Sequence, residues 1–194
     1  MKILYGGAFN PPTQAHLNII KYLIKQYPTA QIILLPSNEN YKEDIIPYKH
    51  RKKMLELIIN ETKKNVIISN YEARKRKFLG TYYTLKAFSH PFFVLGADQI
   101  LKLEQWIKFP LVVSENKFIV FPRDGIKAKE YISQHPILSP LLQNFIFIND
   151  FEESQIASSQ YRLTKNDSIL PSRVKDYILK HKLYHKPIVK EGSE

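Results

Sequence analysis

Short apolar runs alternate along this chain with longer segments in which apolar and polar positions follow helical spacing. The runs hold four or five residues each and are rich in Ile, Val, Leu and Phe; they lie at 2–5, 31–35, 66–69, 92–95, 117–121 and 145–148. Nearly continuous apolar runs of this length are typical of strands buried on both faces, as parallel sheets require. The pattern therefore predicts six strands separated by helical or irregular connections.

The intervening segments predict the helices. The first runs from Gln14 to Gln26, with Ile20, Leu23 and Ile24 on one stripe. Others are expected at 49–61, 81–88, 99–106 and 126–134, with two more after Ser158 and Pro171. A strand, a helix and a second strand fit within the first 36 residues. We therefore predict an α/β protein with a Rossmann-like, doubly wound parallel sheet between two helical layers.

Length and composition restrict the class of protein further. The 194 residues fit one domain, expected over 1–185, with a C-terminal tail at 186–194. Without cysteine there is no disulfide framework, which suits a reducing cytoplasm. No stretch approaches about 18 apolar residues, so we expect a cytoplasmic protein without a signal peptide or membrane span.

The charge favours anionic partners. The chain has 29 basic and 18 acidic residues, a formal charge of +11. Such an excess is compatible with nucleotides, pyrophosphate or nucleic acid, and does not choose among them. Much of the excess is lysine scattered along the chain, so a lysine-rich composition shared by the proteins of its source explains the charge equally well, without a binding surface.

The first strand leads into a loop with the features of a phosphate cradle. Gly6 and Gly7 allow the backbone to turn sharply and approach an anion. Thr13 is placed to cap the following helix, so His16 falls in its first turn, at the positive end of the helix dipole. This geometry predicts an imidazole that faces a bound phosphate. A capped helix with a structural histidine is the alternative.

This loop lacks the spacing of a P-loop or of a dinucleotide-binding G-x-G-x-x-G. It resembles the nucleotidyltransferase superfamily marked by (H/T)-x-G-H, whose signature reads G-G-x-F-(D/N)-P-x-(H/T)-x-G-H. The matching residues are Gly6, Gly7, Phe9, Asn10, Pro11, Thr13 and His16, and Ala15 departs from the usual glycine. The resemblance implies that the Gly7, Ala8 and Phe9 backbone binds ATP and that His16, with Thr13 nearby, stabilises the α-phosphoryl group.

A carboxylate follows the fourth predicted strand. In open α/β sheets ligands bind beyond the carboxyl ends of the strands, so Asp98 and the glycine loop are expected to line one crevice. There Asp98 suits a ribose hydroxyl or a bound Mg²⁺; its alternative role is to cap a helix starting at Gln99. The segment 96–106 matches G-A-D-x-x-x-x-L-x-x-W, which resembles nicotinate-nucleotide adenylyltransferases. The resemblance implies that Asp98 contributes to ATP binding and that Trp106 stacks on a pyridine ring; burial in the core is the alternative for Trp106.

Two further segments are similar to that family on the nucleotide-acceptor side. Thr81, Thr84 and Leu85 fit its Y-T-x-D-T-L segment, whereas Gly80 and Tyr83 replace the usual Tyr and Asp. The resemblance implies contacts from Thr81 and Thr84 to nicotinate mononucleotide. Lys42, in the irregular loop 37–48, is a candidate for its phosphate, with a solvated lysine as the alternative. Arg51 and Met54 fit the R-x-x-M helix that follows the loop in the family.

A candidate second anion site lies near the C-terminus, with a capped helix that exposes its arginine as the alternative. Ser158 and Ser159 begin a short helix, and Arg162 lies one turn on with a permanently charged, planar guanidinium. The segment resembles the family's I-S-S-T-x-I-R, with departures at Ala157, Ser159 and Tyr161. The resemblance implies that Ser158, Ser159 and Arg162 hold the β- and γ-phosphates of ATP. The family's closing P-x-x-V-x-x-Y-I-x-x-x-x-L-Y is similar to the final segment, 171–184.

Taken together, the resemblance implies transfer of the adenylyl group of ATP to nicotinate mononucleotide, giving deamido-NAD and pyrophosphate. It implies Mg²⁺ held through the ATP phosphates rather than by a protein metal site. No nucleic acid or membrane partner is expected, and a homo-oligomer is compatible with the pattern. Two alternatives stay open: a pantetheine-phosphate adenylyltransferase, and a non-catalytic nucleotide- or RNA-binding module that uses the basic run 74–77.

Overall fold

The computed structural model describes residues 1–41, 44–60, 62, 65–154 and 156–184. The predicted domain boundary at residue 185, the tail 186–194 and Lys42 lie outside these residues. The strands are β1 Lys2–Gly7, β2 Gln31–Pro36, β3 Val66–Ile68, β4 Phe92–Gly96, β5 Lys117–Phe121 and β6 Phe145–Phe147. The helices are α1 Gln14–Gln26, α2 Tyr48–Ile59, α3 Thr81–Ala87, α4 Ala97–Ile100, α5 Leu111–Ser114, α6 Ala128–Gln134, α7 Ser158–Thr164 and α8 Ser172–Lys180. Short 3₁₀ turns are η1 Glu39–Tyr41, η2 Leu103–Gln105, η3 Ser139–Asn144 and η4 Asp167–Ile169.

The described strands form one sheet in the order β3-β2-β1-β4-β5-β6, with every neighbouring pair parallel. Chain order runs outward in both directions from the β1–β4 pair, where Ile3 lies opposite Phe92 and Leu4 opposite Phe93. This is the doubly wound arrangement, and its switch point is between β1 and β4. The predicted fold class is confirmed.

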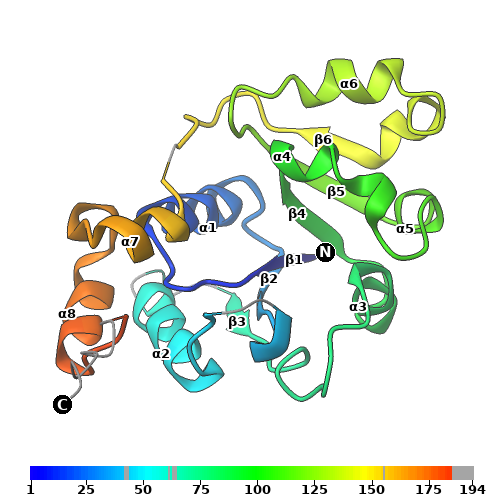
Figure 1. Cartoon of the computed structure of the whole chain (residues 1–194). Coiled ribbons are helices and arrows are strands. Elements are labelled where there is room, and N and C mark those ends of the chain that lie inside the picture. Colours follow the sequence, from blue (N-terminus) through cyan, green and yellow to red (C-terminus); the bar gives the residue numbers. More distant parts are fainter. Residues whose placement is uncertain (42–43, 61, 63–64, 155, 185–194) are drawn as a thin grey trace, which may run out of the picture.

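The sheet lies between two helical layers because alternate residues of each strand face opposite sides. Ile3 and Ile32 belong to a core cluster that includes α1, α2, α7 and α8 residues. Leu4 and Ile33 belong to a second cluster with α3, α4, α5 and α6. Figure 1 shows the same division, with α1, α2, α7 and α8 on one side of the strands and α3, α5 and α6 on the other. Both faces are thus buried, as the unbroken apolar runs predict.

One predicted helix is wrong. In place of a continuous helix at 99–106, α4 begins directly after β4 and ends at Ile100, and η2 follows at Leu103–Gln105. Ala97, Ile100 and Leu103 are all buried and lie three residues apart. A three-residue spacing occurs on one face of an α-helix and of a 3₁₀ helix alike, so these apolar positions do not reveal where α4 ends. Because α4 begins directly after β4, Asp98 lies inside the first turn of α4, and Gly96 takes the N-cap position that was the alternative for Asp98.

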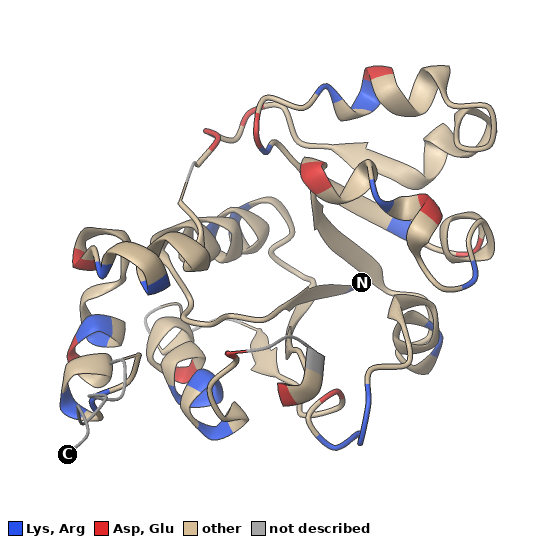
Figure 2. Cartoon of the chain, viewed as in Figure 1, with Lys and Arg blue, Asp and Glu red and all other residues tan. Residues whose placement is uncertain are grey.

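Basic residues are spread over the fold rather than gathered on one face. Figure 2 shows Lys and Arg on α2, α6 and α8 and on the loop that follows β3, on both sides of the sheet. This distribution agrees with the reading of the positive charge as scattered lysine. Binding of an anion must therefore be argued from particular side chains, not from net charge.

Candidate active site

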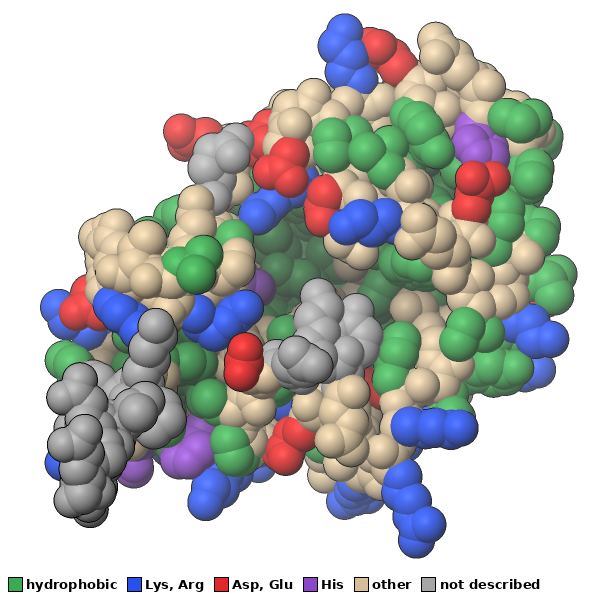
Figure 3. Space-filling view, viewed as in Figure 1, with side chains coloured by type: hydrophobic (Ala, Val, Ile, Leu, Met, Phe, Trp, Pro, Cys, Tyr) green, Lys and Arg blue, Asp and Glu red, His purple; other side chains and the backbone are tan. Residues whose placement is uncertain are grey.

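A cavity of about 360 Å³ opens at the switch point of the sheet. The carboxyl ends of β1 and β4 form its floor, with Gly6, Gly7 and Ala8 on one side and Gly96 and Asp98 on the other. Figure 3 shows a hollow at the centre of this face of the molecule, with hydrophobic side chains in its depth. The crevice predicted from strand order is therefore present, and it brings Asp98 to the glycine loop.

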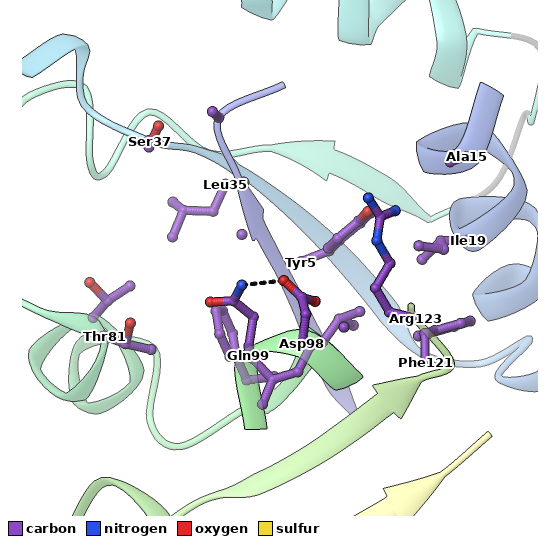
Figure 4. A pocket seen from close by; sticks show the side chains of 18 of the residues that line it. Tyr5, Ala15, Ile19, Leu35, Ser37, Thr81, Asp98, Gln99, Phe121 and Arg123 are labelled. Carbon is purple, nitrogen blue, oxygen red and sulfur yellow. Dashed lines mark hydrogen bonds between the residues drawn. The ribbon is translucent and has the colours of Figure 1, made fainter. Parts of the chain in front are cut away.

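Asp98 has a defined orientation at the cavity wall. The side-chain amide of Gln99 donates to Asp98 Oδ2 at 2.7 Å, a contact visible in Figure 4. Gly96 leaves room for this carboxylate, because a Cβ atom at residue 96 would lie 2.5 Å from Asp98 Oδ1. The remaining oxygen of Asp98 can thus accept a hydrogen bond from a ligand hydroxyl.

Thr13 and His16 form one unit at the start of α1. The backbone N–H of Thr13 donates to His16 Nδ1 at 3.0 Å, and Thr13 Oγ1 lies 2.8 Å from the same nitrogen. Since Nδ1 accepts from a backbone N–H, the neutral ring carries its hydrogen on Nε2. Thr13 is fully buried, so it acts by holding His16 rather than by touching a ligand.

His16 is held in its neutral form. Burial, and to a smaller extent the positive charge of Arg123, lower the pKa of His16 to about 4. The ring packs against Phe9, with centroids 5.2 Å apart, and lies 6.3 Å from the ring of Tyr5. At neutral pH the imidazole is therefore a hydrogen-bond donor through Nε2–H and not a cation.

Arg123 was missed by the sequence reasoning, which treats 122–125 only as a turn. Figure 4 shows its side chain extending from the end of β5 into the space between Tyr5 and α1. Its Nη1 donates to the carbonyl of Ile156 at 3.2 Å, and Nε lies 3.4 Å from Asp124 Oδ1. The signal that could have found it is its position, because a basic residue directly after a parallel strand lies at the ligand edge of the sheet.

Arg51 supports the loop formed by residues 6–13, which we call the phosphate loop. The guanidinium is fully buried, and its N–H groups donate to three carbonyls: Ile46 at 3.0 Å, Ala8 at 2.9 Å and Ser37 at 2.8 Å. Sequence reasoning placed Arg51 on the correct helix but gave it no contact. Its planar fork suits this task, because one side chain fixes the loop, the end of β2 and the segment before α2.

The second predicted anion site meets the first across the phosphate loop. Arg162 Nη1 donates to the carbonyl of Asn10 at 2.8 Å, and Ser158 Oγ donates to the carbonyl of Pro11 at 2.7 Å. Ser159 is exposed, and Phe9 is buried so that only its backbone can serve a ligand. His16 and Arg162 do not line the cavity themselves. Arg162 bonds to Asn10 and His16 bonds to Thr13. Both partners belong to the segment 10–13, which continues from the cavity-lining Gly7 and Ala8.

The residues predicted for the nucleotide acceptor line the opposite end of the cavity. Thr81, Thr84 and Trp106 all contribute to its wall. The hydroxyl of Thr84 donates its hydrogen to Oε1 of the buried Glu72 carboxylate. That hydrogen is therefore already used within the protein. Trp106 packs edge-on against Phe93, with ring centroids 6.3 Å apart. Its side chain is half-buried, so it is not part of the fully buried core. Glu72 is a second cavity residue that the sequence reasoning missed.

The described part of the chain contains neither a metal-binding cluster nor a membrane-spanning helix. Among the described residues, no three His, Cys, Asp or Glu side chains come close enough to hold a metal ion. No helix in the described ranges has the length and apolar character needed to cross a membrane.

Comparison with known proteins agrees with this geometry. The family model described as cytidylyltransferase-like matches residues 4–164. A protein of Acholeplasma laidlawii named "probable nicotinate-nucleotide adenylyltransferase" is 36% identical over 193 residues, covering 95% of this chain and 97% of the relative. A protein of Clostridium acetobutylicum with the same name is 32% identical over 94% of this chain and 98% of its own length.

Solved structures support the fold. A Plasmodium falciparum nicotinic acid mononucleotide adenylyltransferase, solved in complexes with APC and with NaAD, aligns with a TM-score of 0.75 over 94% of this chain and 96% of that chain at 23% identity. With the family model covering most of the chain and full-length relatives above 30% identity, the chain belongs to the cytidylyltransferase-like family and, within it, to the nicotinate-nucleotide adenylyltransferases.

Proposed function

We propose that this protein transfers the adenylyl group of ATP to nicotinate mononucleotide, producing deamido-NAD and pyrophosphate for NAD biosynthesis. The observation that carries the proposal is the meeting of two segments about 150 residues apart in the chain. Arg162 and Ser158 bond the carbonyls of Asn10 and Pro11, six and five residues before His16, at the edge of a cavity with room for a nucleotide.

ATP is proposed to lie with its phosphates along the phosphate loop. The backbone of Gly7, Ala8 and Phe9 would face them, with Ser158, Ser159 and Arg162 at the β- and γ-phosphates and Asp98 at a ribose hydroxyl. A guanidinium has five N–H donors, and the bond to Asn10 uses one of them. The hydroxyl of Ser158 donates to the carbonyl of Pro11 in this structure, so it holds the start of α7 against the phosphate loop.

The chemical step we propose is an in-line displacement. A phosphate oxygen of nicotinate mononucleotide attacks the α-phosphorus of ATP, the bond from that phosphorus to the bridging oxygen breaks, and pyrophosphate leaves with the bonding electrons. No covalent enzyme intermediate forms. His16, held by Thr13, donates its Nε2–H to an α-phosphoryl oxygen as charge builds there, and Arg123 adds positive charge nearby. Catalysis is then positioning plus electrostatic stabilisation.

The acceptor is proposed to occupy the end of the cavity lined by Thr81, Thr84 and Trp106. The indole face of Trp106 suits stacking on a pyridine ring. Lys42 remains a proposed contact to the phosphate of the acceptor. Mg²⁺ bound to ATP would neutralise phosphate charge, and the carboxylate of Asp98, which lines the cavity, has the oxygen chemistry that fits it.

The proposal is tested by offering the full-length protein ATP and Mg²⁺ with one acceptor at a time and measuring pyrophosphate release. Nicotinate mononucleotide is expected to give the highest kcat/KM, above nicotinamide mononucleotide and phosphopantetheine. A preference for phosphopantetheine would identify the pantetheine-phosphate reaction instead. Salt-dependent RNA binding without pyrophosphate release would favour the non-catalytic alternative.

A further inference from the structure

Tyr184 lies at the C-terminal end of the last described segment, beyond α8, and its side chain returns to the phosphate loop. The N–H of Leu183 donates to the carbonyl of Ile178 at 3.0 Å, which turns the chain back after the helix. The ring of Tyr184 then packs edge-on against Tyr161 of α7, with centroids 5.7 Å apart. Figure 1 shows α8 and α7 beside α2 and α1, the helices that flank the loop.

The hydroxyl of Tyr184 donates to Asn10, a phosphate-loop residue with several other hydrogen bonds. Asn10 is 2% exposed. Its Nδ2 donates to the carbonyl of Asp44 at 2.9 Å, and its Oδ1 accepts from the N–H of Ile46 at 3.3 Å and from Tyr184 at 2.9 Å. Because the N–H of Ile46 marks Oδ1 as an acceptor, the hydroxyl of Tyr184 must be the donor.

Asn10 also accepts a hydrogen bond from Arg162. The guanidinium of Arg162 binds the main-chain carbonyl of Asn10, while Tyr184 binds its side chain. Burial raises the pKa of Tyr184, and the charges of Arg51 and Arg162 act in the opposite direction. The hydroxyl therefore lies near both guanidinium groups and stays protonated at neutral pH. Tyr184 thus bonds to Asn10, the residue through which the phosphate loop contacts Arg162 of α7.

We propose that Tyr184 is a positioning residue for ATP. Its hydroxyl fixes Asn10 and thereby sets the placement of Arg162 relative to the backbone of the phosphate loop, without touching either substrate. The inference rests on the proposed function for the identity of the ligand. It explains why a C-terminal residue, 174 positions away in sequence, is bonded to this loop.

The test compares two changes of the same kind in the full chain. Tyr184→Phe removes the bond to Asn10 but keeps the ring that packs on Tyr161. Tyr177→Phe is the matched control, because it removes a phenol hydroxyl of α8 that lies 3.0 Å from His50 Nδ1 of α2 instead of bonding to the phosphate loop. Thermal unfolding checks that both variants fold. Calorimetry then measures the Kd for α,β-methylene-ATP, which cannot be cleaved between its α- and β-phosphorus atoms, and kinetics give KM for each substrate.

Loss of one hydrogen bond in the positioning network predicts that Tyr184→Phe raises the Kd for the analogue and the KM for ATP about fivefold. The KM for nicotinate mononucleotide and all values for Tyr177→Phe should change less than twofold. Hydrogen exchange in the segment 6–13 should accelerate only in Tyr184→Phe. Equal effects on both substrates, equal effects of the two variants, or unchanged ATP binding would overturn the proposal. If the wild type released no pyrophosphate, the proposed function would fail, while the analogue and exchange measurements would still decide the role of Tyr184.

Discussion

At the scale of single residues, the proposed mechanism depends on the protonation state of His16. The bond from the N–H of Thr13 assigns the hydrogen of the neutral ring to Nε2, and burial with Arg123 nearby disfavours a second proton. A neutral donor can contact a phosphoryl oxygen without first losing a proton to it. The imidazole is thus prepared before substrate arrives, which is the condition for electrostatic catalysis.

We predict that His16 titrates with a pKa of about 4 in the unliganded protein. Since this value lies below the ordinary 6.5, His16 contributes stability in full above about pH 6.5 and loses that contribution as the pH falls towards 4. NMR titration of the histidine ring signals measures it, with His16→Asn identifying the signal that disappears. A signal that titrates near pH 6.5 would contradict the burial argument.

Arg123 provides a linked prediction. Replacing it by Gln removes a positive charge that lowers the pKa of His16, so that pKa should rise. The same variant should weaken binding of α,β-methylene-ATP about tenfold, because a cation beside the phosphates is lost. Arg123→Lys keeps the charge and serves as the control for the pKa. If Gln and Lys gave the same pKa for His16, Arg123 would not act through its charge.

At the scale of elements, the N-terminal strand, loop and helix were predicted closely, because their signals are local. Paired glycines, a threonine cap and helical spacing fix β1 and α1 without help from the rest of the chain. The helix at 99–106 was predicted wrongly, since its apolar positions are spaced by three residues and are therefore equally compatible with one continuous helix and with the observed α4 and η2. Helix α5 was not predicted, since it has only four residues, Leu111–Ser114.

The role of Arg51 shows what periodicity leaves out. Spacing places it on α2, but its contacts are carbonyls of the phosphate loop, the end of β2 and the segment 44–46. Helical periodicity does not distinguish such a buried guanidinium from the exposed lysines beside it, and the resemblance to the R-x-x-M helix singled out Arg51 without giving its contacts. Its function follows only from the way the sheet brings α2 under the loop.

We predict that Arg51→Met lowers the free energy of unfolding by about 3 kcal/mol, because three buried carbonyls lose a charged donor. Lys53→Met on the same helix removes only an exposed ion pair with Glu56 and should change stability by less than about 0.5 kcal/mol. Urea denaturation measures both. Similar losses in the two variants would show that the contacts of Arg51 contribute nothing specific.

At the scale of the whole molecule, strand order locates the site. Alternating strands and helices predicted a doubly wound sheet, and the rule that ligands bind at its switch point correctly placed the cavity between β1 and β4. The contact between Arg162 and Asn10 could not be derived in this way, because it depends on how α7 packs after β6. Resemblance to a family supplied the expectation, and the fold supplies the physical connection.

The central claim is that the phosphate loop and α7 hold one triphosphate while His16 stabilises the reacting phosphoryl group. The most direct measurement is steady-state pyrophosphate release by His16→Ala with ATP and nicotinate mononucleotide both saturating. We predict that kcat falls by about 10² or more, as when a single oxyanion donor is removed, while the Kd for α,β-methylene-ATP changes much less. Turnover equal to that of the wild type would remove His16 from the mechanism and contradict the account.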